Sequence, residues 1–312
     1  MDTAKYFTQK YYVIAIAMIC SILWGSAFPV LKISYTELQM LPNDLSAKIV
    51  FAGIRFLLAS ILLFIMILFF MKKSIKIKRN TLLKLLGLGI VQTTCQYFFF
   101  YNALSHIDGM KGAIMTSTET FFLVLIAHFI YENDKINTKK IIGLSTGFLG
   151  IIIANWGKDF NLSFSFLGEG FFIMATLSGA IGNIIAKEFS KKLNPFLLTA
   201  WQMFLGSIVL LILGLPTLSP NAITFTTKGV MLLIYASFLS AIAFSLWYAL
   251  LKYNKAGEIG IYKFMIPISG ALLSIMFIPQ EKFNMNIIFA LLFVTIGIVS
   301  INYTRKRKDE NI

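Results

Sequence analysis

Apolar stretches of about 20 residues recur from one end of the chain to the other, and short polar loops separate them. A run of this length crosses the roughly 30 Å hydrocarbon core of a bilayer as a helix, because a helix rises about 1.5 Å per residue. The chain is 57% hydrophobic and 13% charged, whereas a soluble domain is nearer half apolar and a quarter charged. The sequence therefore predicts an all-α polytopic membrane protein and argues against a soluble enzyme.

Ten segments are expected to cross the membrane. Their approximate ranges are 12–32, 47–70, 82–104, 111–130, 140–156, 168–189, 196–214, 228–251, 257–278 and 284–303. The loops between them are too short to form a folded soluble domain. A basic tail, residues 304–312, follows the last segment.

The basic residues are distributed as membrane topology requires. With the N-terminus placed in the cytoplasm, 20 of the 28 lysines and arginines fall on the cytoplasmic side and six on the outer side, while Arg55 and Lys263 lie within segments. Such a bias is the positive-inside signal, so both termini are expected in the cytoplasm of a cell, or plasma, membrane of bacterial type. The same distribution accounts for the net charge of +14 without a nucleic-acid partner.

The sequence contains no motif that would hold a cofactor or a metal. Cys20 and Cys95 both lie inside apolar segments, where packing is a better explanation than a disulfide or a ligand set. Zinc-ligand spacings, phosphate-binding glycine loops and nucleotide motifs are all missing. No cofactor is therefore expected, and any driving force must be an ion or solute gradient rather than ATP.

Two stretches of the chain align with each other without gaps. GIRFLLASILL (Gly53–Leu63) matches AWQMFLGSIVL (Ala200–Leu210), and the fourth and ninth segments are each followed closely by a glutamate, Glu132 and Glu281. Chance similarity between apolar helices is the alternative explanation. The shared order of these landmarks favours a repeat.

The repeat divides the chain into two halves, residues 12–156 and 168–303, with five segments in each. An odd number of spans means that the second half enters the membrane from the opposite side. Repeats of inverted topology are typical of transporters, in which the substrate site lies near the midplane between the halves.

Several of these stretches together resemble a known family. They are ILWGSAFPVLK (22–32), the arginine in FAGIRFLLA (51–59), FMIPISGALLSIMFIPQE (264–281) and the acidic residue that ends the fourth and ninth segments. In order and spacing they are similar to the EamA-type, ten-helix members of the drug/metabolite transporter superfamily. The resemblance covers nearly the whole chain, and it implies export or exchange of small metabolites.

Two charged residues within segments are the first candidates for a site. Glu119 lies roughly 12 Å, or about eight residues, from the outer end of its segment, and Arg55 lies at a similar depth. Charges in hydrocarbon are costly and are commonly functional. Glu119 is a candidate proton or substrate-cation site, with Arg55 as its partner or as the ligand of a substrate carboxylate. A structural ion pair between them is the alternative.

Polar side chains on neighbouring segments complete the expected lining of the site. The expected lining is Gln92, Gln96, Thr116, Thr120, Trp201, Gln202, Trp247 and Tyr248. Hydrogen bonds between helices are the alternative role for each of these side chains. Lys263, in contrast, is expected to extend its long side chain to the membrane interface.

The sequence thus favours a secondary transporter that exports a small organic metabolite by alternating access. Its expected partners are the small-molecule substrate, the lipid bilayer and, as candidate coupling ions acting through Glu119, protons. A channel, or a membrane scaffold that does not transport, is the alternative. An intramembrane enzyme is disfavoured because paired aspartates, an HExxH motif and a His–nucleophile pair are all missing from the sequence.

Overall fold

The computed structural model describes residues 4–41, 43–104, 106, 109–156, 164–279, 283 and 285–302. Within these ranges every regular element is a helix and no strand occurs, which confirms the predicted all-α class. Glu281 and the basic tail 304–312, on which two predictions rest, lie outside the described residues.

The helices follow one another along the chain with short connections. They are α1 (Ala4–Thr8), α2 (Lys10–Glu37), α3 (Leu45–Ile65), α4 (Arg79–Gly89), α5 (Gln96–Leu104), α6 (Gly109–Thr116), α7 (Thr118–Ile130), α8 (Thr138–Ala154), α9 (Phe171–Lys192), α10 (Pro195–Gly214), α11 (Thr227–Tyr253), α12 (Ala256–Gly260), α13 (Met265–Phe277) and α14 (Asn286–Asn302). Short π-helical or 3₁₀-helical turns extend or join several of them. These turns are Met66–Phe70, Ile90–Cys95, Glu132–Asp134, Phe166–Gly170, Leu215–Thr217 and Ile261–Phe264.

Six helical stretches of the described chain are long and apolar enough to cross a membrane. They are Lys10–Glu37, Leu45–Phe70, Phe166–Lys192, Pro195–Thr217, Thr227–Tyr253 and Ala256–Phe277. Two shorter apolar helices, Ile114–Ile130 and Asn286–Asn302, accompany them. The structure thus agrees with a multi-pass membrane protein, and the count of ten spans stays a prediction.

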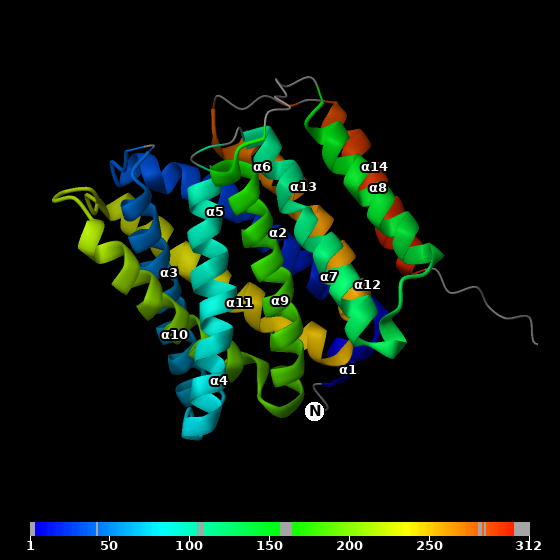
Figure 1. The fold of residues 1–312 in the computed structure, drawn as a ribbon, viewed down its shortest axis with the longest axis horizontal. Coiled ribbons are helices and arrows are strands. Elements are labelled where there is room, and N and C mark those ends of the chain that lie inside the picture. Colours follow the sequence, from blue (N-terminus) through cyan, green and yellow to red (C-terminus); the bar gives the residue numbers. More distant parts are fainter. Residues whose placement is uncertain are drawn as a thin grey trace, which may run out of the picture.

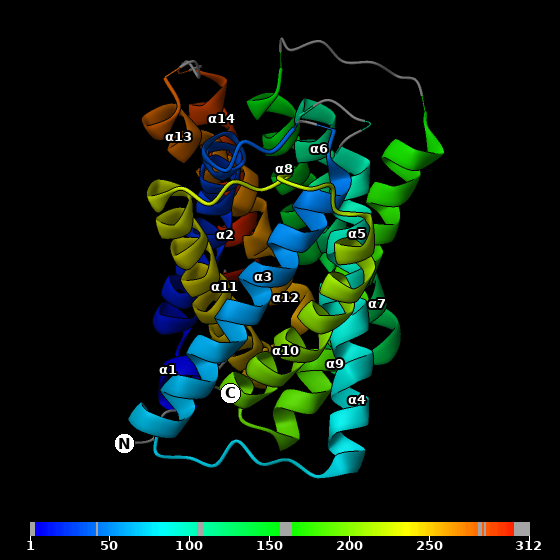
Figure 2. The same cartoon turned by 90° about the vertical axis from the view of Figure 1, so that its left-hand side faces the viewer.

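The long helices pack against partners that are distant in the sequence. α2 contacts α11 and α13, whereas α9 contacts α5 and α7. α3 pairs with α10, and α8 pairs with α14, which lies beside it at one edge of the bundle (Figure 1). The N-terminus and the connection from α3 to α4 mark one end of the bundle, which we call the N-terminal end (Figure 2).

Side-chain caps fix where two of the long helices begin. The Asp44 carboxylate accepts a hydrogen bond from the Ala47 amide at the start of α3, with a distance of 2.9 Å. The Asn194 side chain accepts one from the Phe196 amide at 2.9 Å, and Pro195 fills the first position of α10. Each cap satisfies an amide that has no partner within its own helix.

Small residues allow α8 and α14 to approach closely. A Cβ added to Gly150 would lie 2.9 Å from the Ala290 carbonyl oxygen, and one added to Gly297 would lie 3.0 Å from the Gly143 carbonyl oxygen. Close backbone approach of this kind drives helix association in membranes, where lipid is as apolar as the helix surface.

Candidate functional site

An ion pair between Glu119 and Lys263 joins α7 to the 3₁₀-helical turn before α13. The Glu119 Oε1 atom lies 2.5 Å from the Lys263 Nζ atom, and the two side chains are 12% and 8% exposed. One residue comes from each predicted half of the chain. Because neither charge is well hydrated, each offsets part of the cost of burying the other.

Both residues stand where a helix is interrupted. Between α6 and α7, the hydroxyls of Ser117 and Thr118 donate to carbonyls three residues back, at 2.5 and 2.7 Å. Such side-chain bonds compete with the helical ladder. In the first turn of α13, Pro267 has no amide hydrogen to donate to the carbonyl of Lys263, four residues earlier. Interrupted helices are common at transporter sites.

Amide side chains hold the Glu119 carboxylate on its other sides. Asn183 on α9 donates through Nδ2 to Glu119 Oε1 at 3.0 Å, and Gln96 on α5 donates through Nε2 to Oε2 at 3.4 Å. The Gln92 Nε2 atom in turn donates to Gln96 Oε1 at 2.6 Å. Asn183 Oδ1 accepts from the Trp247 indole at 2.8 Å. Three elements besides its own helix therefore hold the carboxylate: α9, α5 and the 3₁₀-helical turn that carries Lys263.

Two indole rings enclose the Lys263 ammonium group. The Nζ atom lies 5.3 Å from the ring centroid of Trp24 and 5.0 Å from that of Trp247. The two indoles meet edge to face with centroids 5.3 Å apart, and Phe244 lies 5.2 Å from Trp24. Cation–π contacts to desolvated rings are favourable by about 2 kcal/mol. The expectation that Lys263 extends to the membrane interface is therefore wrong.

Two glycines on α9 make room for these side chains. A Cβ at Gly179 would lie 2.7 Å from Gln96 Nε2 and 2.8 Å from Glu119 Cδ. One at Gly182 would lie 2.0 Å from Gln92 Oε1. A larger residue at Gly179 would displace Gln96 or the carboxylate itself, and one at Gly182 would displace Gln92, which bonds to Gln96.

A π-helical turn, Ile90–Cys95, carries Gln92 toward α9. The next two side chains point to α10, because Thr93 donates to Gln202 Oε1 at 3.0 Å and Thr94 donates to the Gly206 carbonyl at 2.9 Å. Single π-helical turns within α-helices occur frequently at functional sites. Gln202 thus lies at the interface with this turn, and its Nε2 atom is buried without a partner among the described residues.

The predicted pairing of Glu119 with Arg55 is wrong. Arg55 is 3% exposed, and its guanidinium carbon lies 4.4 Å from the ring centroid of Phe56 and 5.4 Å from that of Tyr97. No described acidic residue lies within ion-pairing distance of it. Depth along a helix, which the sequence gives, does not specify the direction in which a side chain points, and Lys263 occupies the position beside Glu119.

The other expected lining residues divide into two groups. Trp247 contacts the ion pair, and Tyr248 beside it is fully buried, with a hydroxyl that has no partner among the described residues. Trp201, in contrast, donates to the Ile75 carbonyl at 3.0 Å, in the connection between α3 and α4. The structure therefore places Trp201 away from the ion pair.

Two threonines near Glu119 bond to backbone atoms. Thr116 donates to the Gly112 carbonyl of its own helix at 2.9 Å, and Thr120 donates to the Gly260 carbonyl at 3.4 Å. The bond from Thr120 ties α7 to α12, next to the turn that carries Lys263. These contacts are of the interhelical and local kind that the sequence offers as the alternative to a lining role.

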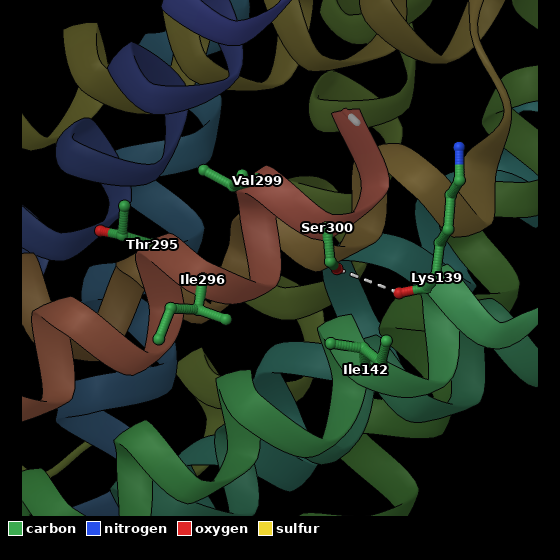
Figure 3. Close-up of a pocket in the computed structure, with 6 residues that line it drawn as sticks. All are labelled: Lys139, Ile142, Thr295, Ile296, Val299 and Ser300. Atoms are coloured by element: carbon green, nitrogen blue, oxygen red, sulfur yellow. Dashed lines mark hydrogen bonds between the residues drawn. The ribbon is translucent and has the colours of Figure 1, made fainter. Parts of the chain in front are cut away.

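Figure 3 shows a pocket between α8 and α14, and neither Glu119 nor Lys263 lines it. It is lined by Lys139, Ile142, Thr295, Ile296, Val299 and Ser300. Ser300 donates to the Lys139 carbonyl at 3.1 Å, while Ile296 and Val299 are 52% and 55% exposed. None of the expected site residues lines it. Its exposed apolar side chains fit a surface that faces lipid.

Known proteins resemble this chain over most of its length. Residues 11–156 and 166–303 match the EamA-like transporter family. The uncharacterized transporter YoaV of Bacillus subtilis is 23% identical over 290 residues, covering 92% of this chain and 96% of that protein. An uncharacterized transporter of Archaeoglobus fulgidus is 26% identical over 268 residues, covering 85% and 88%. A solved crystal structure with 12% identity shares the fold, with a TM-score of 0.75 over 94% of this chain and 96% of the other.

Proposed function

The chain belongs to the EamA-like transporter family, and from this premise we propose that it is a secondary transporter that exports small organic metabolites across the cell membrane by alternating access. The observation that carries the proposal is the buried ion pair of Glu119 and Lys263, with one residue from each predicted half. A polar site between two halves is where a carrier can expose its substrate to one side and then the other.

The packing of the helices supports ten spans in two inverted halves. α2 contacts α11 and α13, and α9 contacts α5 and α7. In the two predicted halves, α2 corresponds to α9, α5 to α11 and α7 to α13. Replacing each helix by its counterpart therefore turns the contacts of α2 into those of α9. The same replacement leaves the pairs α3–α10 and α8–α14 unchanged, because each pair joins two counterparts. The family also matches the chain in two stretches, 11–156 and 166–303, which nearly coincide with the predicted halves.

Protons are the proposed coupling ions, with Glu119 as their site. Protonation of Glu119 would remove the negative charge beside Lys263 and leave the lysine without its counterion. The relative free energies of two access states would then change, because the cost of an unpaired charge depends on how well each state hydrates it. The coupling therefore needs only one titrating carboxylate at the site.

A second buried ion pair supports closure of the bundle at its N-terminal end. The Lys140 Nζ atom lies 2.5 Å from Asp134 Oδ1, and both side chains are 1% exposed. Asp134 Oδ2 also accepts from the Gly257 amide at 2.8 Å, so it links the connection after α7 to the start of α12. Opening of this end toward the cytoplasm would require this link to break.

The proposed location is a bacterial cell membrane, with the N- and C-termini in the cytoplasm. The excess of lysine and arginine on that side of the predicted topology supports this orientation. A reporter enzyme that is active only in the cytoplasm, fused after the last residue, is expected to be active. Activity of a periplasm-specific reporter at the same position would contradict the orientation.

Transport is tested first by binding and then by flux. The purified protein is screened by thermal shift against small organic solutes, because a ligand at about 100 times its Kd stabilises the folded state by about 2.7 kcal/mol. A solute that raises the melting temperature is then expected to enter proteoliposomes, which contain the protein, faster than it enters liposomes without protein. Specific binding without flux would favour the alternative of a non-transporting scaffold.

Gly179→Ala is expected to impair transport more than it impairs folding. The added methyl group would lie 2.8 Å from Glu119 Cδ and 2.7 Å from Gln96 Nε2, so at least one of these side chains must shift. Overpacking of this kind costs about 1–3 kcal/mol. A roughly tenfold fall in initial flux is expected, since about 1.4 kcal/mol corresponds to a factor of ten.

The matched control for this prediction is Gly87→Ala on α4. The added methyl group there meets no atom within 4 Å. Flux by this variant is expected to equal that of the wild-type protein, at similar melting temperature. If the two alanine variants transport equally well, Gly179 does not shape the site.

A further inference from the structure

Arg55 is a buried cation whose charge the described chain does not neutralise. It occupies the middle of α3 (Leu45–Ile65), too far from either end to extend into water, and it is 3% exposed. No described carboxylate lies within ion-pairing distance of it. Its Nε and Nη1 atoms are buried and have no hydrogen-bond partner among the described residues. Arginine does not lose its charge in proteins, so the cost of burying it cannot be avoided by deprotonation.

The aromatic contacts of Arg55 reduce this cost only in part. The guanidinium lies over the rings of Phe56 and Tyr97, whose centroids are 4.5 Å apart. These contacts stabilise the charge, and the Tyr97 hydroxyl forms a hydrogen bond with the guanidinium group, but Nε and Nη1 still have no acceptor among the described residues. Guanidinium groups usually direct these N–H groups in parallel at a carboxylate or a phosphate. The unbonded face of Arg55 is therefore suited to an anion.

Arg55 and the ion pair lie at opposite ends of a chain of aromatic contacts. Phe56 lies 6.5 Å from Phe244, Phe244 lies 5.2 Å from Trp24, and Trp24 contacts the Lys263 ammonium group. Because Lys263 already neutralises Glu119, the net charge of these three ionised side chains is +1, and it resides on Arg55. A single anionic group attached to an apolar body would match both the charge and the rings.

The hydroxyl of Tyr248 supplies a second unsatisfied group in the same region. It is buried and has no partner among the described residues, and the Tyr248 ring packs against Phe244 with centroids 6.0 Å apart. A buried polar atom without a partner is unfavourable unless a ligand or water completes its bonding. A carboxylate oxygen accepts hydrogen bonds from both O–H and N–H donors.

We propose that Arg55 binds the carboxylate of an organic anion whose apolar body packs against Phe56, Phe244 and Trp24. This inference rests on the proposed transport function and names the class of substrate. The carboxylate would accept hydrogen bonds from Nε and Nη1 and would neutralise the site. A structural arginine would instead be satisfied in the empty protein, which these two atoms are not.

The test compares carboxylates with their uncharged amides. The purified protein is heated with phenylacetate or phenylacetamide, and with hexanoate or hexanamide. At least one acid is expected to raise the melting temperature by about 2 °C or more, whereas its amide is expected to have no effect. If no acid stabilises the protein, or if the amides stabilise it equally, the inference is wrong.

Arg55→Met separates a binding role from a structural one. The variant removes an unneutralised buried charge, so the empty protein is expected to melt about 2 °C higher than wild type, and the stabilisation by the acid is expected to disappear. A structural role predicts a lower melting temperature. Arg55→Lys, which keeps the charge without the planar pair of donors, is expected to show at most about one tenth of the wild-type affinity, and wild-type affinity in Arg55→Lys would overturn the inference.

The failure of this inference can be distinguished from the failure of transport. If proteoliposomes take up amides or amines and no carboxylate, Arg55 does not select an anion, and the protein is still a transporter. If no solute that binds is taken up, the proposed function is wrong irrespective of Arg55. A flux of carboxylate that Arg55→Met abolishes would support both.

Discussion

Glu119→Gln is expected to abolish the pH dependence of transport and to lower its rate at least tenfold. Glutamine has nearly the size of glutamate but cannot titrate or neutralise Lys263, whose ammonium group lies 2.5 Å away in the wild-type protein. Removal of one member of a buried pair costs about 3–5 kcal/mol, and about 1.4 kcal/mol in a barrier is a factor of ten. Initial rates of uptake into proteoliposomes, measured across the neutral pH range, give both effects.

Glu132→Gln is the control for this prediction. Glu132 follows α7 on the same stretch of chain, but it is exposed in the turn Glu132–Asp134. The rate and the pH dependence of this variant are expected to equal those of the wild-type protein. If Glu119→Gln retains pH-dependent transport, the carboxylate is not the coupling site.

Lys263→Met is expected to lower the melting temperature by roughly 6 °C or more. The substitution keeps a long side chain but leaves the Glu119 carboxylate, which is 12% exposed, without its counterion. The cost of about 3–5 kcal/mol corresponds to roughly 2–4 °C per kcal/mol. Transport is expected to be lost as well. Thermal unfolding of the purified protein, followed by intrinsic tryptophan fluorescence, measures the shift.

Lys191→Met provides the matched comparison on a surface ion pair. Lys191 pairs with Glu188 at 2.6 Å, but the side chains are 47% and 45% exposed, so the loss is expected to be within about 1 kcal/mol. The double variant Glu119→Gln/Lys263→Met is expected to melt higher than Lys263→Met alone, because it contains no unpaired charge at this position. Strictly additive effects of the two substitutions would contradict a direct pair.

The positions of the helices could be predicted from hydropathy and from caps. The segment predicted at 196–214 corresponds to α10 (Pro195–Gly214), whose start is fixed by Asn194 and Pro195. The segment predicted at 82–104 contains a π-helical turn that hydropathy does not reveal, because the turn changes the hydrogen-bond pattern and not the polarity. The described helices therefore follow the apolar runs, while their irregular turns do not.

The sequence indicates Glu119 because a carboxylate within an apolar run is rare, but it does not indicate the partner of Glu119. Lys263 lies close to the end of its segment, where a lysine can extend to the interface, and the direction of its side chain depends on the 3₁₀-helical turn before Pro267. The sequence places Trp201 beside Gln202 on the same lining, but adjacent helical residues point about 100° apart. The sequence of an apolar segment does not specify how the helix is rotated about its axis, and this rotation decides which neighbour each side chain faces.

Asn183 is absent from the predicted lining, although the sequence holds a signal for it. Gly179 and Gly182 precede it on α9, and together they admit Gln92, Gln96 and the Glu119 carboxylate beside the helix. Small residues next to an amide within an apolar segment indicate a face that approaches other polar helices. Which helix approaches that face follows only from the tertiary packing.

The measurement that tests alternating access most directly is trans-stimulated efflux from proteoliposomes. The vesicles are loaded with a labelled solute that stabilises the protein, and the unlabelled solute is added outside. An alternating-access carrier is expected to show efflux that the outside solute accelerates and that saturates with its concentration, because the loaded site reorients faster than the empty one. Flux that rises linearly with concentration and does not respond to solute on the other side would contradict alternating access and indicate a channel.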